Sequence, residues 1–127
     1  MELDALNKLH DRMEALGATS LAISPQKISL NRAFVEKHVL HFEILSDPDN
    51  RVAAAYGLRW TLPVDLRELY VSFGLDIPGG NGDHSWRLPM PARYVIDRAG
   101  VIRYASTDPD YTRRPEPEES LAVLETI

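Results

Sequence analysis

The sequence contains no cysteine among its 127 residues. A thiolate is the group that attacks peroxides and disulfides, and it also ligates iron–sulfur clusters and many zinc ions. Its absence excludes disulfide bonds, thiolate metal centres and every cysteine nucleophile from this chain. Serine and threonine do not replace a thiolate in peroxide cleavage. We therefore expect no catalytic residue of this type and no bound cofactor.

Positive charge is also sparse and dispersed. Fourteen Lys and Arg residues stand against nineteen Asp and Glu residues, for a formal net charge of -5, and no basic cluster is longer than Arg113–Arg114. This chain therefore lacks the basic patch that binds nucleic acid or an anionic membrane. It also lacks a run of 18 apolar residues and a basic segment of the kind that opens an export signal. We expect neither nucleic acid nor membrane as a partner, and the cytoplasm as the compartment.

The hydrophobic residues that are present, 44% of the chain, follow helix and strand periods over most of its length. They predict a single domain of residues 1–127 in the α/β class. Helices are expected at residues 3–16, 30–38, 47–57 and 62–73 and from residue 117 onward. Strands are expected at residues 18–24, 42–45, 92–96 and 101–105, the last two as a hairpin around residues 97–100. The first strand has no polar alternation, which indicates a buried strand in a parallel sheet.

Two of the helices have clear start signals. Asp47 precedes Pro48, and aspartate at the N-cap followed by proline at the first helical position is a common helix opening. Pro117 is followed by Glu118 and Glu119, whose charges suit the positive end of a helix dipole. The helix that begins at Asp47 and Pro48 has the clearest start and end signals in the sequence.

Residues 59–90 are expected to form an extended arm. It contains the helix at 62–73 and then a segment, Gly74–Pro89, that reads as a loop of unusual length for a small domain. Such loops are often lids or interface arms. Asp83, His84 and Trp86 are its candidate contact residues. Asp83 and His84 stand beside a serine, but adjacent residues do not form the hydrogen-bond chain of a hydrolase triad.

Several segments, taken in order, carry a family resemblance. They are Gly17–Gln26, Leu45–Asp47, Ala55–Leu58, Asn81–Gly82 with Ser85–Trp86, Pro91–Asp97, Gly100–Arg103 and Asp110–Arg114. Together they resemble the peroxiredoxin-like AhpC/TSA proteins of the thioredoxin fold, an antioxidant and oxidoreductase family. The resemblance implies a thioredoxin-like three-layer α/β/α sandwich with a mixed sheet.

The resemblance also exposes a difference. Such proteins begin with a strand and a loop that holds the reactive cysteine at the N-terminus of the first helix, where the helix dipole lowers the thiol pKa. Residue 1 here already lies in what resembles that helix, so we interpret the chain as an N-terminally truncated form of the fold. Without the cysteine, we do not expect the chain by itself to be a competent thiol peroxidase.

The resemblance places a vestigial active-site cleft at Met90, Pro91 and Arg93. A cis-proline begins the third core strand of the thioredoxin fold, which implies a cis Met90–Pro91 bond, and a trans proline at a strand start is the alternative. Arg93 lies in a strand that should be covered on both faces. It either holds an anion in the cleft or forms a surface or interface ion pair, and we favour the ion pair.

Two other groups of polar residues have ordinary interpretations. His38 and His41 are three residues apart and can share a metal ion, but zinc needs a third and fourth ligand. We therefore favour a helix terminus and expect no metal. Arg113 and Arg114, near Asp108 and Asp110, are interpreted as a solvated charge cluster.

Three functions are compatible with these observations. The leading hypothesis is a peroxiredoxin-like protein whose present chain has no redox centre. The alternative is a non-catalytic thioredoxin-fold module for binding or assembly, with the arm and the empty cleft as its interface. An enzyme of another class built on Asp83, His84 or Arg93 lacks any arrangement of nucleophile and base that the sequence can support.

The missing first strand has a topological consequence. In the thioredoxin arrangement it lies between the strand at 18–24 and the strand at 92–97, so its absence leaves two edges with unpaired main-chain groups. Either these two strands pair with each other, or a second copy of the chain covers the edge. We favour association and expect a homodimer.

Overall fold

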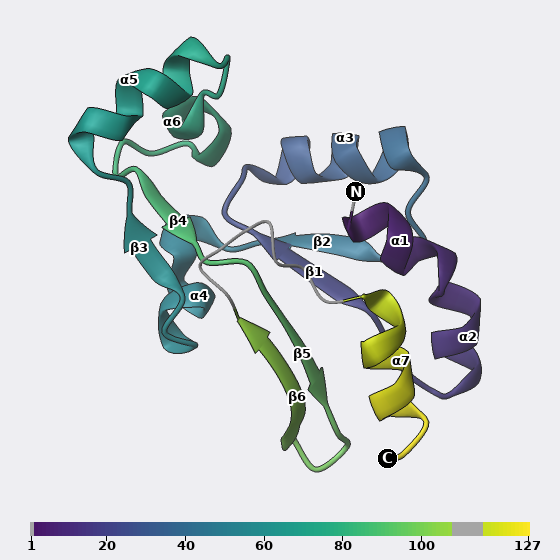
Figure 1. Cartoon of the computed structure of the whole chain (residues 1–127). Helices are drawn as coiled ribbons and strands as arrows, with labels where there is room; N and C mark the ends of the chain where they lie inside the picture. The colour runs from purple at the N-terminus through teal and green to yellow at the C-terminus, as the bar shows by residue number, and fades with distance from the viewer. Residues whose placement is uncertain (1, 108–115) are drawn as a thin grey trace.

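The computed structural model describes residues 2–107 and 116–127 of the chain (Figure 1). The expected charge cluster of Asp108, Asp110, Arg113 and Arg114, and the resemblance at Asp110–Arg114, lie outside the described residues. The elements in chain order are α1 (Glu2–Lys8), α2 (His10–Ala15), β1 (Leu21–Ser24), α3 (Ile28–His38), β2 (Glu43–Ser46), the 3-10 turn η1 (Pro48–Asn50), α4 (Arg51–Ala55), β3 (Arg59–Thr61), α5 (Val64–Ser72), α6 (Ile77–Asn81), β4 (Arg87–Pro89), β5 (Ala92–Ile96), β6 (Ile102–Thr107) and α7 (Pro117–Leu124).

The helix expected at residues 3–16 is two helices, α1 and α2, that meet at Leu9. Three of its predicted apolar positions, Leu6, Leu9 and Met13, nevertheless pack in one cluster. Leu9 and Met13 are buried together with Leu121 of α7, and this cluster is the core at the end of the molecule where both termini lie. Gly17 follows α2 with a φ of 78°, the left-handed conformation expected of a residue just past a helix end.

The strands form three separate pairs. β1 and β2 are parallel, with Leu21 opposite Glu43 and Ser24 opposite Ser46, which confirms the parallel strand predicted at this position. β5 and β6 form the predicted antiparallel hairpin. β3 and β4 form a second antiparallel pair that the sequence analysis did not anticipate. Parallel and antiparallel pairing therefore both occur, but among the described residues no ladder joins one pair to another.

The burial predicted for β1 is wrong. The side chains of Leu21 and Ile23 are 62% and 50% exposed. A strand is fully buried only when neighbours cover both its edges and its faces, and within residues 2–107 and 116–127 only β2 pairs with β1. β1 also does not pair with β5, so the two strands have not closed on each other in the way that one expectation required.

The helices pack on different strands. α3 packs against β2, whereas α7 packs against β5 and β6 and also contacts α1 and α2 (Figure 1). No helix of the described residues is long and apolar enough to span a membrane. The parallel pair with α3 and the hairpin with α7 are thus two halves that the N-terminal helices connect.

The helix expected after Asp47 is interrupted by two left-handed residues, Asp49 and Asn50. Asp47, the predicted capping residue, nevertheless caps a helix. The carboxylate of Asp47, which is 3% exposed, accepts hydrogen bonds from the N–H groups of Val52 at 3.0 and 3.1 Å and of Ala53 at 3.1 Å. Asp47 therefore caps α4, the helix that follows the interruption, rather than the residues directly after it.

The arm at residues 59–90 is more regular than predicted. Gly74–Pro89 is not a single loop, because it contains α6 and β4. The carboxylate of Asp76 accepts a hydrogen bond from the N–H of Gly79 at 3.0 Å and so caps α6 despite its two glycines. β4 pairs with β3, and Leu62, with no exposed surface, anchors the arm at its base.

Candidate functional site

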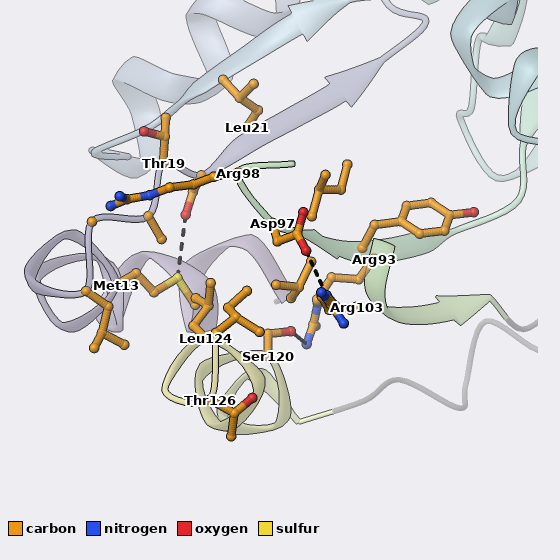
Figure 2. Close-up of a pocket in the computed structure, with 18 of the residues that line it drawn as sticks. Met13, Thr19, Leu21, Arg93, Asp97, Arg98, Arg103, Ser120, Leu124 and Thr126 are labelled. Carbon is orange, nitrogen blue, oxygen red and sulfur yellow. Dashed lines mark hydrogen bonds and ion pairs between the residues drawn. The ribbon is translucent and has the colours of Figure 1, made fainter. Parts of the chain in front are cut away.

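A groove of about 950 Å³ lies between the segment that leads into β1 and the β5–β6 hairpin (Figure 2). Residues 16–21 form one wall, residues 93–99 of β5 and the following turn form the other, and the C-terminal part of the chain from Ser120 contributes the base. Residues 18–21 and 93–97 of these walls belong to the two strands that the sequence analysis expected on either side of the family's first strand. The groove is therefore the candidate functional site.

The base of the groove is apolar. Leu6, Met13 and Leu124 line it from three helices. The Ser20 hydroxyl donates a hydrogen bond to the Met13 sulfur at 3.5 Å, which connects the start of β1 to α2. A ligand at this base is contacted by hydrocarbon and thioether groups, which favour apolar side chains.

Arg93 lines the groove. Its guanidinium Nη1 donates hydrogen bonds to the backbone carbonyl oxygen of Glu116 at 3.2 Å and to the hydroxyl of Ser120 at 3.4 Å. Figure 2 shows this side chain reaching from β5 toward α7. The contacts fix β5 against the first turn of α7 and so hold one wall of the groove in place.

Asp97 organises the turn at the end of the same wall. Its Oδ1 accepts hydrogen bonds from the N–H groups of Ala99 and Val101, both at 2.9 Å, and its Oδ2 accepts one from Arg103 Nε at 2.7 Å. These donors, the Val101 N–H first and the Arg103 side chain next, lower the pKa of Asp97 below its usual value. The ionised carboxylate therefore stabilises the hairpin turn.

The first prediction concerns this carboxylate. Because the folded-state pKa of Asp97 is depressed, its stabilising contribution is complete above the unfolded-state value of about 3.9 and is lost as the pH falls through the folded-state value. We expect the carboxyl carbon resonance of Asp97 to titrate below pH 3.9. In an Arg103→Gln variant the midpoint should rise yet stay below 3.9, because the Val101 and Ala99 donors remain. A wild-type midpoint at or above 3.9 would contradict this account.

Met90 and Pro91 lie just before β5 and are not in the groove lining. The cis bond predicted between them is wrong, since the described residues contain no cis peptide. The Met90 N–H donates to the Leu58 carbonyl at 2.8 Å, which continues the β3–β4 pairing and leads the chain, extended, into β5. Pro91 thus precedes a strand in trans, the geometry that X–Pro bonds favour by about 0.5–1 kcal/mol.

The candidate loop contacts lie in the arm and not in the groove. The Asp83 carboxylate accepts hydrogen bonds from the N–H and hydroxyl of Ser85 at 2.9 and 2.7 Å, and these bonds lower the pKa of Asp83. The Arg67 guanidinium lies over the ring of Trp86, 5.4 Å from its centroid. His84 is exposed. Of the six site residues that the sequence analysis named, only Arg93 lines the groove.

The sequence that forms the groove matches the model of a known protein family. The sequence model of the AhpC/TSA family matches residues 1–105. The chain belongs to the AhpC/TSA family. The resemblance stated from short segments is thereby confirmed, and the matched region includes both walls of the groove.

Curated relatives of this AhpC/TSA chain are peroxiredoxins. It is 27% identical to the chloroplastic peroxiredoxin Q of Triticum aestivum, over 97% of this chain and 46% of that protein. A shorter stretch of 46 residues is 41% identical to the putative peroxiredoxin bcp of Haemophilus influenzae, covering 36% of this chain and 30% of that one. The chain thus spans about half the length of the peroxiredoxin Q sequences that it matches.

Solved structures show the fold. Peroxidoxin BcpB from Mycobacterium tuberculosis superposes with a TM-score of 0.71 at 18% identity, covering 99% of this chain and 68% of that one. Reduced Prx3 from Vibrio vulnificus gives a TM-score of 0.68 at 20% identity, covering 97% and 67% of the two chains. The thioredoxin-like fold predicted from the sequence is therefore confirmed for this AhpC/TSA chain.

The two histidines considered as a metal pair have different neighbours. His38 Nδ1 lies 3.4 Å from the Asp4 carboxylate, and its ring stacks on Phe34. The ring of His41 stacks on that of His10, with centroids 5.4 Å apart. His38 thus packs among α1 and α3 residues while His41 joins α2, so each helps to hold the N-terminal helices.

Sequence reasoning missed most of the residues that form the groove. Ser120 receives the Arg93 bond, Tyr94 and Ile96 form the wall, and Leu21 faces them. No motif marks these residues, because they are ordinary apolar and small residues of strands and a helix. The available signal was topological: Leu21, Tyr94 and Ile96 lie on the two strands that the sequence analysis expected on either side of the family's first strand.

Proposed function

We propose that this chain by itself is a non-catalytic binding domain of the AhpC/TSA family and does not carry out the thiol chemistry that the name peroxiredoxin implies for its relatives. The observation that carries the proposal is the open groove between residues 16–21, which lead into β1, and β5, and among the described residues β1 pairs only with β2 and β5 only with β6. Such a surface binds a ligand without any covalent step.

The chemistry of the side chains supports the same proposal. Reduction of a peroxide by a thiol enzyme requires a thiolate that is oxidised to a sulfenic acid and then regenerated by a second thiol. The 127 residues include no cysteine. The polar groups that line the groove, such as Arg93, Asp97 and Ser120, bind, orient and stabilise but do not supply electrons.

The second prediction tests this function directly. The purified chain, with dithiothreitol or with thioredoxin and its reductase as the electron donor, should consume neither hydrogen peroxide nor an organic hydroperoxide faster than buffer. A cysteine-containing peroxiredoxin in the same assay serves as the positive control. Peroxide consumption that persists through repurification and scales with the concentration of the chain would refute the proposal.

A further inference from the structure

Three side chains with metal-ligating atoms lie close together on α2. His10, Asp11 and Glu14 each offer one nitrogen or carboxylate oxygen, and these three atoms lie within 4.8 Å of one another. His10 Nε2 is 3.1 Å from Glu14 Oε2. The two residues are one helical turn apart, so their side chains lie on the same face of α2. The helix thus presents one imidazole and two carboxylates at one place.

A second imidazole joins this cluster from another part of the chain. The ring of His41, in the segment between α3 and β2, stacks on the ring of His10 with centroids 5.4 Å apart. Asn7 of α1 holds this segment in place, because its Oδ1 accepts the His41 N–H at 2.7 Å and its Nδ2 donates to the Val39 carbonyl at 3.1 Å. The sequence paired His41 with His38, whereas the fold brings it to His10.

The types of ligand in the cluster select the kind of ion. Zn²⁺ is bound by histidine nitrogen and carboxylate oxygen at about 2.0–2.2 Å, with four ligands in a tetrahedron. Those bond lengths place two ligand atoms about 3.4 Å apart, close to the 3.1 Å between His10 Nε2 and Glu14 Oε2. Ca²⁺ and Mg²⁺ prefer oxygen ligands, so a pair of imidazoles disfavours them.

We propose that His10, Asp11, Glu14 and His41 bind one Zn²⁺ ion. The three ligands on α2 keep nearly their present positions, and His41 supplies the fourth after its ring turns out of the stack. Asp11 and Glu14 are exposed, so the ion reaches the cluster from solvent and offsets the charges of both carboxylates. None of the four residues lines the groove, so this site is separate from the binding surface proposed above.

The test is zinc binding by the full chain without an affinity tag, since a polyhistidine tag itself binds the ion. A calorimetric titration with Zn²⁺ should saturate at one ion per chain, and Ca²⁺ should bind about tenfold or more weakly. The ring nitrogen resonances of His10 and His41 should shift when zinc is added, whereas those of His38 and His84 should stay in place.

Four variants locate the ligands. Asp11→Asn and Glu14→Gln keep the size of two exposed side chains, so they should fold normally and lower the zinc affinity by about tenfold or more. His10→Ala and His41→Ala should lower it to a similar degree. Zinc should also raise the urea midpoint of the wild-type chain more than that of the Glu14→Gln variant, because an ion that binds only the folded state stabilises it.

Glu68→Gln and His84→Ala are the matched controls. Each removes the same kind of group from an exposed position of the arm, away from α2. Both variants should bind zinc with the wild-type affinity and stoichiometry. A loss of affinity in either control equal to that in the ligand variants would show that zinc binds to scattered surface groups and would contradict the proposal.

Four further outcomes overturn it. They are binding that does not saturate at one ion per chain, equal affinity for Ca²⁺ and Zn²⁺, wild-type affinity in any of the four ligand variants, and a loss in His38→Ala as large as that in His10→Ala. The last would assign the ion to the His38–His41 pair. The zinc titration involves neither peroxide nor the groove, so the failure of this inference is distinguishable from the failure of the proposed function.

Discussion

Replacing Leu121 with alanine is expected to lower the free energy of unfolding by about 2–5 kcal/mol. Leu121 is 3% exposed and packs with Leu9 and Met13 in the buried cluster that joins α7 to the N-terminal helices. Alanine leaves a cavity there, and the other two members of the cluster lie in or beside short helices that give little support of their own. The midpoint of urea unfolding, with its slope, measures the loss.

Leu69→Ala is the matched control for this prediction. Leu69 also lies in a helix, but it is 47% exposed. Its replacement should cost less than about 1 kcal/mol, because a half-exposed leucine loses little buried area and alanine has the higher helix propensity. Equal losses for the two variants would show that the Leu9–Met13–Leu121 cluster is not the core of this end of the molecule.

The Leu121 variant also bears on the candidate site. The same helix holds Ser120, which accepts the hydrogen bond from Arg93, and Leu124, which lines the base of the groove. A loosened α7 therefore removes the support of one wall. Because small domains are stable by only about 5–15 kcal/mol, the loss is a large part of the total.

Replacing Asp47 with alanine is the second large effect, with an expected loss of about 2–3 kcal/mol. The buried carboxylate accepts hydrogen bonds from two N–H groups at the start of α4, and hydrogen bonds to a charged group are worth about 1.5–3 kcal/mol. Its removal leaves the Val52 and Ala53 donors without their acceptor. Thermal and urea unfolding should both show the loss.

Asp65→Ala provides the comparison for Asp47. Asp65 lies in the first turn of α5 and is exposed, so only its interaction with the helix dipole is lost, about 0.3–1 kcal/mol. A loss for Asp47→Ala no larger than that for Asp65→Ala would mean that the buried hydrogen bonds contribute nothing beyond the ordinary preference for an acidic helix start.

Much of the secondary structure was predictable because its signals are local. The β5–β6 hairpin has a turn of Asp97 to Gly100 between two apolar runs, and Gly100 has the positive φ, 82°, that such a turn requires. α7 begins at Pro117 as predicted. The capping role of Asp47 was also predicted, although the two left-handed residues after Pro48 moved its bonds to α4.

The arm shows where local signals fail. The two glycines of α6 and the long polar segment around it predicted a loop, but the Asp76 cap and the pairing of β4 with β3 supply the missing stabilisation. Three-residue strands such as β3 and β4 carry no usable period. Their pairing joins residues 26 to 30 positions apart, from Thr61 with Arg87 to Arg59 with Pro89, which no short window contains.

The sequence by itself determined the family, through ordered short segments, and the chemistry that is excluded, through the absence of cysteine. Composition and local pattern settle such questions because each residue carries its own chemistry and its own preferred period. Only the tertiary structure decided that β1 and β5 stay apart, that Pro91 is trans and that Arg93 bonds to α7. Strand pairing is made by main-chain groups that every residue shares, so side-chain patterns do not specify which edges meet and which remain open.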